Sequence, residues 1–190
     1  MFEFLPAIDD WIYYQINSVL THPALDAFFL WITDLHKTPY FKFIAVPLVA
    51  FMFIRHFKRE GVTLFLFLIL TLSCSDFVGG QIKHLVARER PEYNLALSQT
   101  QRSEAGGYGF PSNHASNMFA FATYTSQFLP QTRIPLFVIA SAVGYSRIYN
   151  GVHYPSDVFA GSIMGMLWGL LMSKIAKQVL NYFRKRKNAE

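Results

Sequence analysis

Polar residues divide this chain into apolar segments whose lengths constrain the fold more than any other feature. The segments cover residues 25–35, 40–54, 61–82, 115–129, 134–145 and 158–175. A helix needs about 20 residues to cross the hydrocarbon core of a bilayer. Several segments are shorter, so we expect neighbouring polar residues to continue some of the helices, and residues 25–35 need not span completely. The sequence predicts an all-α, polytopic membrane helix bundle with about six transmembrane helices.

Composition supports this class. Hydrophobic residues make up 52% of the chain and charged residues only 15%, which excludes both an ordinary soluble domain and a disordered chain. The one cysteine, Cys74, excludes an internal disulfide and a cysteine-based metal cluster. The formal net charge is +5, but many of the cations lie beside apolar segments or in polar clusters. Nucleic acid is therefore not an expected partner, and no pattern indicates an oligomeric state.

A further helix is predicted before the first apolar segment. Its apolar residues recur at helical spacing, which is typical of an amphipathic helix, and we expect it to pack on the bundle or lie in the membrane interface without a chemical role. No basic region precedes it, so cleavage as a signal peptide is not expected, and residues 1–190 are expected to form one domain. Its apolar residues are Phe4, Ile8, Trp11, Ile12, Ile16 and Val19, opposite Asp9, Asp10 and Asn17.

Basic residues beside the segment ends predict the orientation. Lys and Arg in short loops are retained in the cytoplasm. Two basic groups, in residues 55–59 and 184–187, are separated by four predicted crossings and so lie on the same side. The loops at residues 90–111 and 149–155 then lie on the extracytoplasmic side, where their own cations need another explanation.

The first polar cluster follows segment 61–82. Lys83 and Arg90 lie seven residues apart, so on a continued helix both side chains face the same way. Paired cations can hold the oxygens of a phosphate, and Pro91 would end the helix. The alternative is that both cations merely extend to water at the membrane surface.

A glycine-rich stretch, residues 106–114 with the sequence GGYGFPSNH, precedes the fourth segment. Glycines let the backbone approach a ligand closely. A helix that begins after Ser112, a suitable N-cap, directs free N–H groups at an anion. His114 would lie beside that anion, or alternatively be a solvated surface histidine.

The third cluster comprises Ser146, Arg147, His153 and Asp157, between the last two segments. Pro155 suits the first turn of a helix, so Asp157 can fold back to hold one nitrogen of His153 while the other faces a substrate. This pair predicts a histidine nucleophile whose developing positive charge the carboxylate stabilises. Arg147 adds a third cation. The alternatives are an ordinary helix-start acid and a surface arginine.

The alternating directions of the helices place all three clusters on one face of the membrane. In this order they closely resemble the signature of the type 2 phosphatidic acid phosphatase superfamily, Lys-x(6)-Arg-Pro, Pro-Ser-Gly-His and Ser-Arg-x(5)-His-x(3)-Asp. Residues 83–91 and 146–157 match fully, whereas in residues 111–114 Asn113 replaces the family glycine, which leaves the fine specificity open. The resemblance covers about residues 61–175.

The resemblance implies six membrane helices and a phosphatase that works through a phosphohistidine. His153 is the implied nucleophile, Asp157 orients it, and His114 protonates the leaving oxygen and then activates water. We expect neither a metal ion nor a cofactor, because cations rather than a carboxylate cluster surround the phosphate. The implied phosphate-binding residues are Lys83, Arg90, Ser112, Asn113 through its backbone N–H, and Arg147.

The expected substrate is a lipid phosphate or pyrophosphate at the extracytoplasmic side of a bacterial-type inner membrane. The short loops resemble those of small bacterial members and favour undecaprenyl pyrophosphate. Phosphatidylglycerophosphate, phosphatidic acid and a lipid A phosphate are alternatives with the same chemistry. A lipid-binding or lipid-moving protein would not need the pair of His153 and Asp157, and a vanadium-dependent haloperoxidase would not need apolar spans.

Some polar residues have no assigned role. Asp76 lies inside segment 61–82, where an unpaired acid is costly, so it either braces Lys83 or has another partner. His84, Arg88 and Arg102 are candidates for the entrance to the site, but their spacing does not decide this.

Overall fold

A computed structural model of the chain describes residues 4–93 and 100–188, without the side chains of residues 4–6. The side chain of Phe4 and part of the expected loop at residues 90–111 lie outside this description. Every regular element within the described ranges is helical. The longer helices are α1 Phe4–Tyr14, α2 Pro23–Asp34, α3 Val46–Phe57, α4 Arg59–Val86, α5 Asn113–Ser126, α6 Arg133–Tyr149 and α7 Pro155–Lys187; the short ones are η1 Gln15–Val19, η2 Leu35–Lys37, η3 Phe41–Ala45, η4 Pro91–Tyr93 and η5 Pro130–Thr132.

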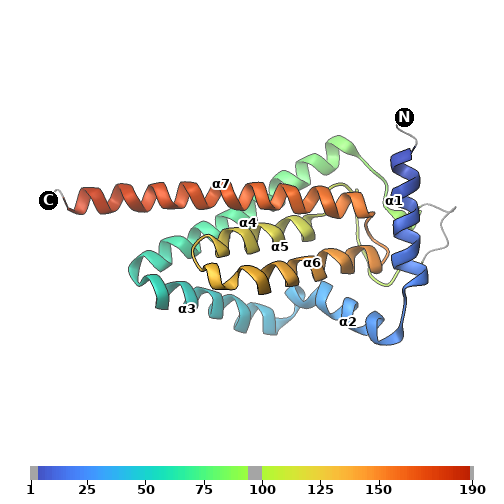
Figure 1. Cartoon of the computed structure of the whole chain (residues 1–190), viewed down its shortest axis with the longest axis horizontal. Helices are drawn as coiled ribbons and strands as arrows, with labels where there is room; N and C mark the ends of the chain where they lie inside the picture. The colour runs from blue at the N-terminus through green and yellow to red at the C-terminus, as the bar shows by residue number, and fades with distance from the viewer. Residues whose placement is uncertain (1–3, 94–99, 189–190) are drawn as a thin grey trace.

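Helices α3 to α7 run roughly along the long axis of the molecule, and α7 extends past the others toward the C-terminus (Figure 1). Helix α5 packs against α4, α6 and α7. The contact between α5 and α7 is close because Gly161 and Gly165 of α7 face the backbone carbonyls of Ser112 and Ser116, where any side chain would overlap. These glycines fix the start of α5 against the start of α7.

The apolar core lies in the half of the bundle away from the start of α7. Phe53, Leu64, Leu68, Tyr124 and Met172 are buried there. The Tyr124 hydroxyl donates a hydrogen bond to the Leu64 carbonyl at 2.9 Å, so this buried hydroxyl is satisfied. Many outward-facing side chains of the same helices are also apolar, as lipid surroundings require; they include Phe51, Leu66, Phe159 and Leu167.

Two helical stretches are long and apolar enough to cross a membrane by themselves, Arg59–Tyr93 and Pro155–Lys187. The pair Pro23–Lys37 and Phe41–Phe57, bent by 59°, counts as a third if it is one span. Helices α5 and α6 have 14 and 17 residues, fewer than the ~20 that span a bilayer core. The all-helical membrane fold is confirmed for the described residues, whereas the expected count of six spans is not.

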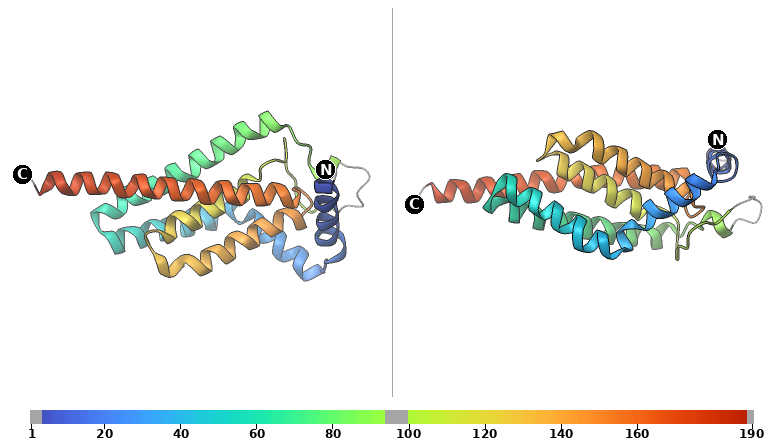
Figure 2. Two further views of the ribbon diagram at one scale, coloured as in Figure 1. Left: turned by 45° about the horizontal axis from the view of Figure 1, so that its top comes forward. Right: turned by 90° about the horizontal axis from the view of Figure 1, so that it is seen from below.

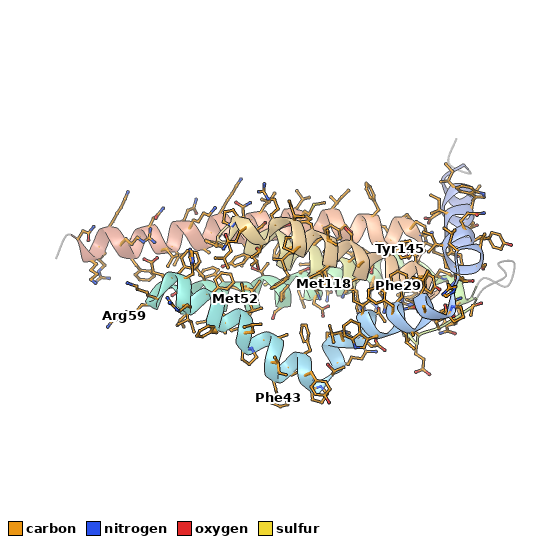
Figure 3. The ribbon with its side chains drawn as sticks, turned by 60° about the horizontal axis from the view of Figure 1, so that its bottom comes forward. Phe29, Phe43, Met52, Arg59, Met118 and Tyr145 are labelled. Carbon is orange, nitrogen blue, oxygen red and sulfur yellow. The ribbon has the colours of Figure 1, made fainter. Side chains whose placement is uncertain are left out.

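Helix α2, which precedes the bend between residues 37 and 41, packs on α6. Figure 3 shows Phe29 of α2 beside Tyr145 of α6, and their ring centroids are 5.1 Å apart. Phe43 lies near the turn into α3. The aromatic contact brings the end of α2 close to the polar end of α6.

Helix α1 lies across the end of the bundle, next to the start of α7 (Figures 1 and 2). A helix is predicted here, but the polar face is turned toward the protein: Asp9 and Asn17 are only 7% and 0% exposed, whereas Trp11 is 64% exposed. Asn17 Nδ2 donates to the Tyr149 carbonyl at 2.9 Å. The polar face turns inward because this end of the bundle presents hydrogen-bonding groups to it, beside a small apolar cluster in which Tyr13 packs against Ile148 and Tyr154.

Candidate active site

The predicted site residues lie together where the ends of α4 and α6 meet the starts of α5 and α7. Arg90, Ser112, Arg147, His153 and Asp157 come from three separate stretches of sequence, and none is more than 5% exposed. Burying charged groups costs free energy unless they are paired and hydrogen-bonded. The hydrogen-bond and ion-pair partners of each of these residues therefore indicate how the site is built.

Lys83 and Arg90 reach the site by different routes. The expectation that both lie on one face of a continued helix is wrong, because α4 ends before Ala87, which has a left-handed conformation with a φ of 48°. Arg90 therefore lies on a loop. Lys83 Nζ donates hydrogen bonds to the carbonyls of Tyr108 at 2.9 Å and Pro111 at 2.8 Å. The lysine thus holds the glycine-rich stretch against the end of α4.

Arg90 ties the same stretch to the third cluster. Its Nε donates to the Gly107 carbonyl at 2.9 Å, Nη2 to the Gly106 carbonyl at 3.0 Å and Nη1 to the Val152 carbonyl at 2.7 Å. Gly107 has a φ of 69°, which favours glycine, and this allows the chain to curve around the guanidinium. Beyond the curve, Ser112 Oγ accepts a hydrogen bond from the first turn of α5, as expected of the predicted N-cap.

His153 lies between Asp157 and Arg90. Asp157 Oδ2 is 3.4 Å from His153 Nδ1, somewhat longer than an ordinary hydrogen bond, and accepts a hydrogen bond from the Tyr154 N–H at 3.0 Å. On the other side of the ring, Arg90 Nη1 is 3.1 Å from Nε2. A guanidinium only donates, so Nε2 accepts and the proton of a neutral imidazole lies on Nδ1, toward the carboxylate.

The imidazole of His153 is neutral at pH 7. Burial is the main cause that holds the pKa of His153 well below its usual range, and the positive charges of Arg90, Arg147 and Lys83 lower it further. A neutral imidazole retains the lone pair on Nε2 that a nucleophile needs.

Helix α2 and the turn after it contribute two residues that the sequence analysis does not single out. Arg147 Nη1 donates to Thr33 Oγ1 at 2.6 Å, and the His36 ring lies edge-on to the His114 ring with centroids 5.0 Å apart. Within residues 4–93 and 100–188, Arg147 Nε and His114 Nε2 are buried and lack a hydrogen-bond partner. Buried polar atoms are rarely left unpaired, so both atoms are suited to bind oxygens of a ligand.

Asn113, which replaces the family glycine, directs its side chain at α4. Its Nδ2 donates to Asp76 Oδ1 at 3.0 Å, and Asn117 Nδ2 donates to the same oxygen at 3.1 Å. Asp76 is therefore held by α5, and no salt bridge joins it to Lys83 in the described part of the chain. A side chain at Gly79 would overlap the Asn113 amide, so this glycine makes room for it.

Arg88 contacts the third cluster from the loop after α4. Its Nη1 donates to Asp157 Oδ1 at 2.7 Å, and its Nη2 donates to Asp9 Oδ2 at 2.6 Å. Asp9 also accepts a hydrogen bond from the Ser156 N–H at 2.8 Å. The sequence offers Arg88 only as a residue of the entrance and Asp9 only as part of a polar helix face, because no motif spacing joins the two. Arg102, another entrance candidate, pairs with an acid of α2.

The arrangement can bind and transfer a phosphoryl group. Three cations surround a neutral histidine, and such cations stabilise the charge on the equatorial oxygens of phosphorus during transfer. The described residues contain no group of three side chains suited to hold a metal ion.

Comparisons with known proteins agree with this chemistry. A family model described as the PAP2 superfamily matches residues 61–180. A lipid A 4'-phosphatase of Bacteroides thetaiotaomicron is 30% identical over 94% of this chain and 81% of that protein. A putative undecaprenyl-diphosphatase of Escherichia coli is 32% identical, over 60% of this chain and 57% of that protein.

Two solved structures resemble the fold. The crystal structure of LpxE from Aquifex aeolicus has a TM-score of 0.69 and 30% identity and covers 86% of this chain and 93% of that one. A PAP2-type phosphatidylglycerolphosphate phosphatase of Bacillus subtilis has a TM-score of 0.76, covers 92% and 87%, and at 22% identity shows the fold alone. From its motifs, its polar helix ends and its match to the family model, this chain belongs to the PAP2 superfamily of membrane lipid phosphatases.

Proposed function

We propose that this membrane lipid phosphatase transfers the phosphate of its substrate first to His153 and then to water. The observation that carries the proposal is the buried, neutral imidazole, with Asp157 behind Nδ1 and Nε2 facing the cations. Attack of Nε2 forms the N–P bond as the P–O bond to the lipid breaks, and the Asp157 carboxylate stabilises the positive charge that develops on the ring. A protein that only binds or moves lipids has no need of this pair.

The cations bind the phosphate oxygens in this proposal. Lys83, Arg90 and Arg147 supply charge, and Ser112 and the backbone N–H of Asn113 supply further donors at the start of α5. Arg90 Nη1 contacts Nε2 of the nucleophile at 3.1 Å, so a phosphate oxygen that takes over this donor releases the Nε2 lone pair for attack. Substrate binding and activation of the nucleophile are then coupled.

His114 is the proposed general acid and base. Its Nε2 has no protein partner in the described residues, so it can give a proton to the leaving oxygen and then take one from the water that attacks the phosphohistidine. Replacing His114 with alanine should slow hydrolysis of substrates with poor leaving groups by about 100-fold to 10,000-fold. Substrates with good leaving groups should lose less. Equal losses for both kinds of leaving group would argue against this role.

We further propose that the reaction needs no metal ion, because cationic side chains take the place that divalent ions have in many other phosphoryl-transfer enzymes. Chelators should leave activity intact, and vanadate should inhibit as a mimic of five-coordinate phosphorus. Strict dependence on a divalent ion would contradict this part of the mechanism.

For the substrate we propose a phosphate monoester on an acylated glucosamine lipid of the lipid A type. Relatives that match most of the chain, from Bacteroides thetaiotaomicron and Porphyromonas gingivalis, are lipid A 4'-phosphatases. A polar depression of about 530 Å³ also adjoins the phosphate site through Gly106, whose carbonyl binds Arg90. Polar side chains suit a sugar head group better than an isoprenoid chain. The depression is lined by Lys37, Glu92, Tyr93, Gln101, Glu104, Ala105 and Gly106.

Undecaprenyl pyrophosphate, the substrate favoured by the short loops, is the second candidate. It is supported by the Escherichia coli relative described as a putative undecaprenyl-diphosphatase. Its terminal phosphate would occupy the same cationic site, because the phosphate-binding groups contact phosphorus oxygens and not the rest of the molecule.

We place the site on the extracytoplasmic side of the membrane. The turn between α3 and α4 and the end of α7 lie at the opposite end of the bundle from the start of α7, which His153 closely precedes (Figure 1). Basic residues are present in the last turns of α3 and α7. Such residues favour the cytoplasm. A lipid in the outer leaflet would then reach the site by lateral diffusion.

A side-by-side turnover assay tests the proposed function. Purified protein in liposomes is given lipid A bisphosphate, undecaprenyl pyrophosphate, phosphatidic acid and phosphatidylglycerophosphate, and released phosphate is measured against a His153→Ala control. We expect catalytic efficiency at least tenfold higher on lipid A, a difference of about 1.4 kcal/mol in transition-state stabilisation. A tenfold preference for undecaprenyl pyrophosphate would favour the second candidate, and a preference for a glycerophospholipid would reject both. No release from any lipid would refute the phosphatase activity.

A further inference from the structure

Arg88 bridges two buried carboxylates that come from opposite ends of the sequence. Its Nη1 binds Asp157 Oδ1 at 2.7 Å and its Nη2 binds Asp9 Oδ2 at 2.6 Å. The guanidinium also lies over the Tyr154 ring, 4.2 Å from its centroid, a favourable position for a cation. Both terminal nitrogens are thus engaged by acids, so Arg88 differs from Arg147, whose Nε has no protein partner in the described ranges.

Asp9 completes this bridge from helix α1. Its carboxylate accepts hydrogen bonds from the Ser156 N–H at 2.8 Å and the Ser156 hydroxyl at 2.5 Å, and Arg88 Nη1 donates to that hydroxyl at 2.6 Å. Asp9, Arg88, Ser156 and Asp157 therefore form a closed network at the first turn of α7. We call these four residues the acid clamp.

We propose that Arg88 and Asp9 are positioning residues, which hold the Asp157 carboxylate in the orientation that directs His153 at phosphorus. The proposal rests on the proposed nucleophile and concerns residues outside the phosphate-binding set. Asp9 also lies outside residues 61–180, which match the family model. The proposed role of Asp9 would make helix α1 part of the catalytic apparatus instead of a packing element.

The division of contacts on Asp157 supports this role. Oδ2 faces the Tyr154 N–H and the His153 ring, while Oδ1 faces Arg88. Asp157 is fully buried, so without Arg88 its Oδ1 would lack a charged partner and the carboxylate would turn or gain a proton. Either change would move the carboxylate from its position 3.4 Å from His153 Nδ1, where it can orient the ring. In other catalytic triads, disturbing the orienting carboxylate lowers turnover far more than binding.

The experiment compares Arg88→Ala, Arg88→Lys and Asp9→Asn with wild type on the lipid that wild type hydrolyses best. We expect Arg88→Ala to lower kcat by about 10-fold to 100-fold, similar to the loss when a residue that orients a metal-binding side chain is removed. KM and the inhibition constant of inorganic phosphate should change less than about threefold, because Arg88 is already bound to two acids. Arg88→Lys should recover part of the loss, since lysine can contact one carboxylate but cannot bridge both.

Asp9→Asn should lower kcat less than Arg88→Ala, because Arg88 keeps its contact to Asp157. The double variant should be no slower than Arg88→Ala alone, since both act through one contact. The matched control is Asp26→Asn, which removes an acid that pairs with Arg102 at 2.8 Å and accepts a hydrogen bond from the Tyr149 hydroxyl, neither of which belongs to the acid clamp; its kcat should stay within twofold of wild type.

If inhibition of Arg88→Ala by inorganic phosphate weakens as much as kcat falls, the proposal is overturned, because Arg88 would then be a phosphate-binding residue. Additive losses of kcat in the double variant would also overturn the proposal. So would an Arg88→Lys protein that is as well folded as wild type but turns over no faster than Arg88→Ala. If wild type forms no acid-labile phosphoenzyme, the histidine nucleophile on which the proposal rests is refuted instead. This measurement therefore distinguishes failure of the proposed function from failure of the positioning role.

Discussion

At one end of the bundle Phe53, Leu64 and Leu68 fill the space between helices, and at the other end Arg147, His153 and Asp157 are buried just as deeply. The apolar end is stabilised by surface removed from water, which is non-directional and roughly additive. The polar end is stabilised by specific donors and acceptors, where the loss of one partner leaves another unpaired.

This difference predicts a separation of effects along the bundle. Substitutions in the apolar half should lower stability and spare turnover, because the helices there only carry the site. Substitutions at the polar end should lower turnover, because the same contacts orient the reacting groups.

Replacing His153 with glutamine should have the largest effect on activity, a loss of at least about 1,000-fold in kcat, because no other group at this position can form the phosphoenzyme. Glutamine has a similar size, so the unfolding midpoint in detergent should change little. Acid-quenched wild type given labelled lipid should retain phosphate that is acid-labile and alkali-stable, and the variant should not. Label on any other residue would contradict the assignment.

Replacing Leu68 with alanine tests the apolar end. The side chain is 2% exposed, so the cavity should reduce the free energy of unfolding by about 2–5 kcal/mol, while kcat stays within twofold. The control is Leu66→Ala on the same helix, which is 59% exposed and should cost much less. Chemical unfolding in detergent measures both, and a large loss of kcat at unchanged stability would break the proposed separation.

The pH dependence of stability tests the polar end. The folded protein keeps His153 neutral, because burial and then the cations Arg90, Arg147 and Lys83 lower the pKa of His153 well below its usual range, against a smaller opposing effect of a backbone hydrogen bond with Gly109. The unfolded chain takes up a proton near pH 6.5. The contribution of His153 to stability is thus present above about pH 6.5 and lost as pH falls, by up to ~1.4 kcal/mol per pH unit. Unfolding curves at pH 7 and pH 5 should show this loss in wild type and less of it in His153→Gln.

Replacing Asn113 with glycine should have the smallest effect. The Asn113 side chain is directed at Asp76, which Asn117 also binds, and glycine retains the backbone N–H proposed to contact phosphate. We expect a change in kcat/KM below about threefold and a stability loss of at most about 1 kcal/mol from glycine in the first turn of α5. A change above tenfold in the ratio of efficiencies on lipid A and undecaprenyl pyrophosphate would instead make Asn113 a specificity residue.

Local sequence information was sufficient for the all-helical membrane class and for bringing the motif residues together, but not for the number of spans or for the end of α4. Apolar segments require helices wherever lipid offers no hydrogen bonds, and the alternation of their directions is enough to bring Lys83, Ser112 and His153 to one end. The N-cap at Ser112 and the continuation of α6 through Arg147 also follow from residues within one or two turns.

Only the tertiary structure decided which distant groups become partners. Arg90 reaches the site on a loop because Ala87 ends α4, and Asp9 meets Arg88 across 79 residues of sequence. No periodicity encodes such a pair, since it depends on where the packed backbones place two side chains. The inward turn of the polar face of α1 has the same origin. A helix buries its polar face when the surface that it meets is itself polar, and the surface at this end of the bundle forms only when α4, α6 and α7 pack together.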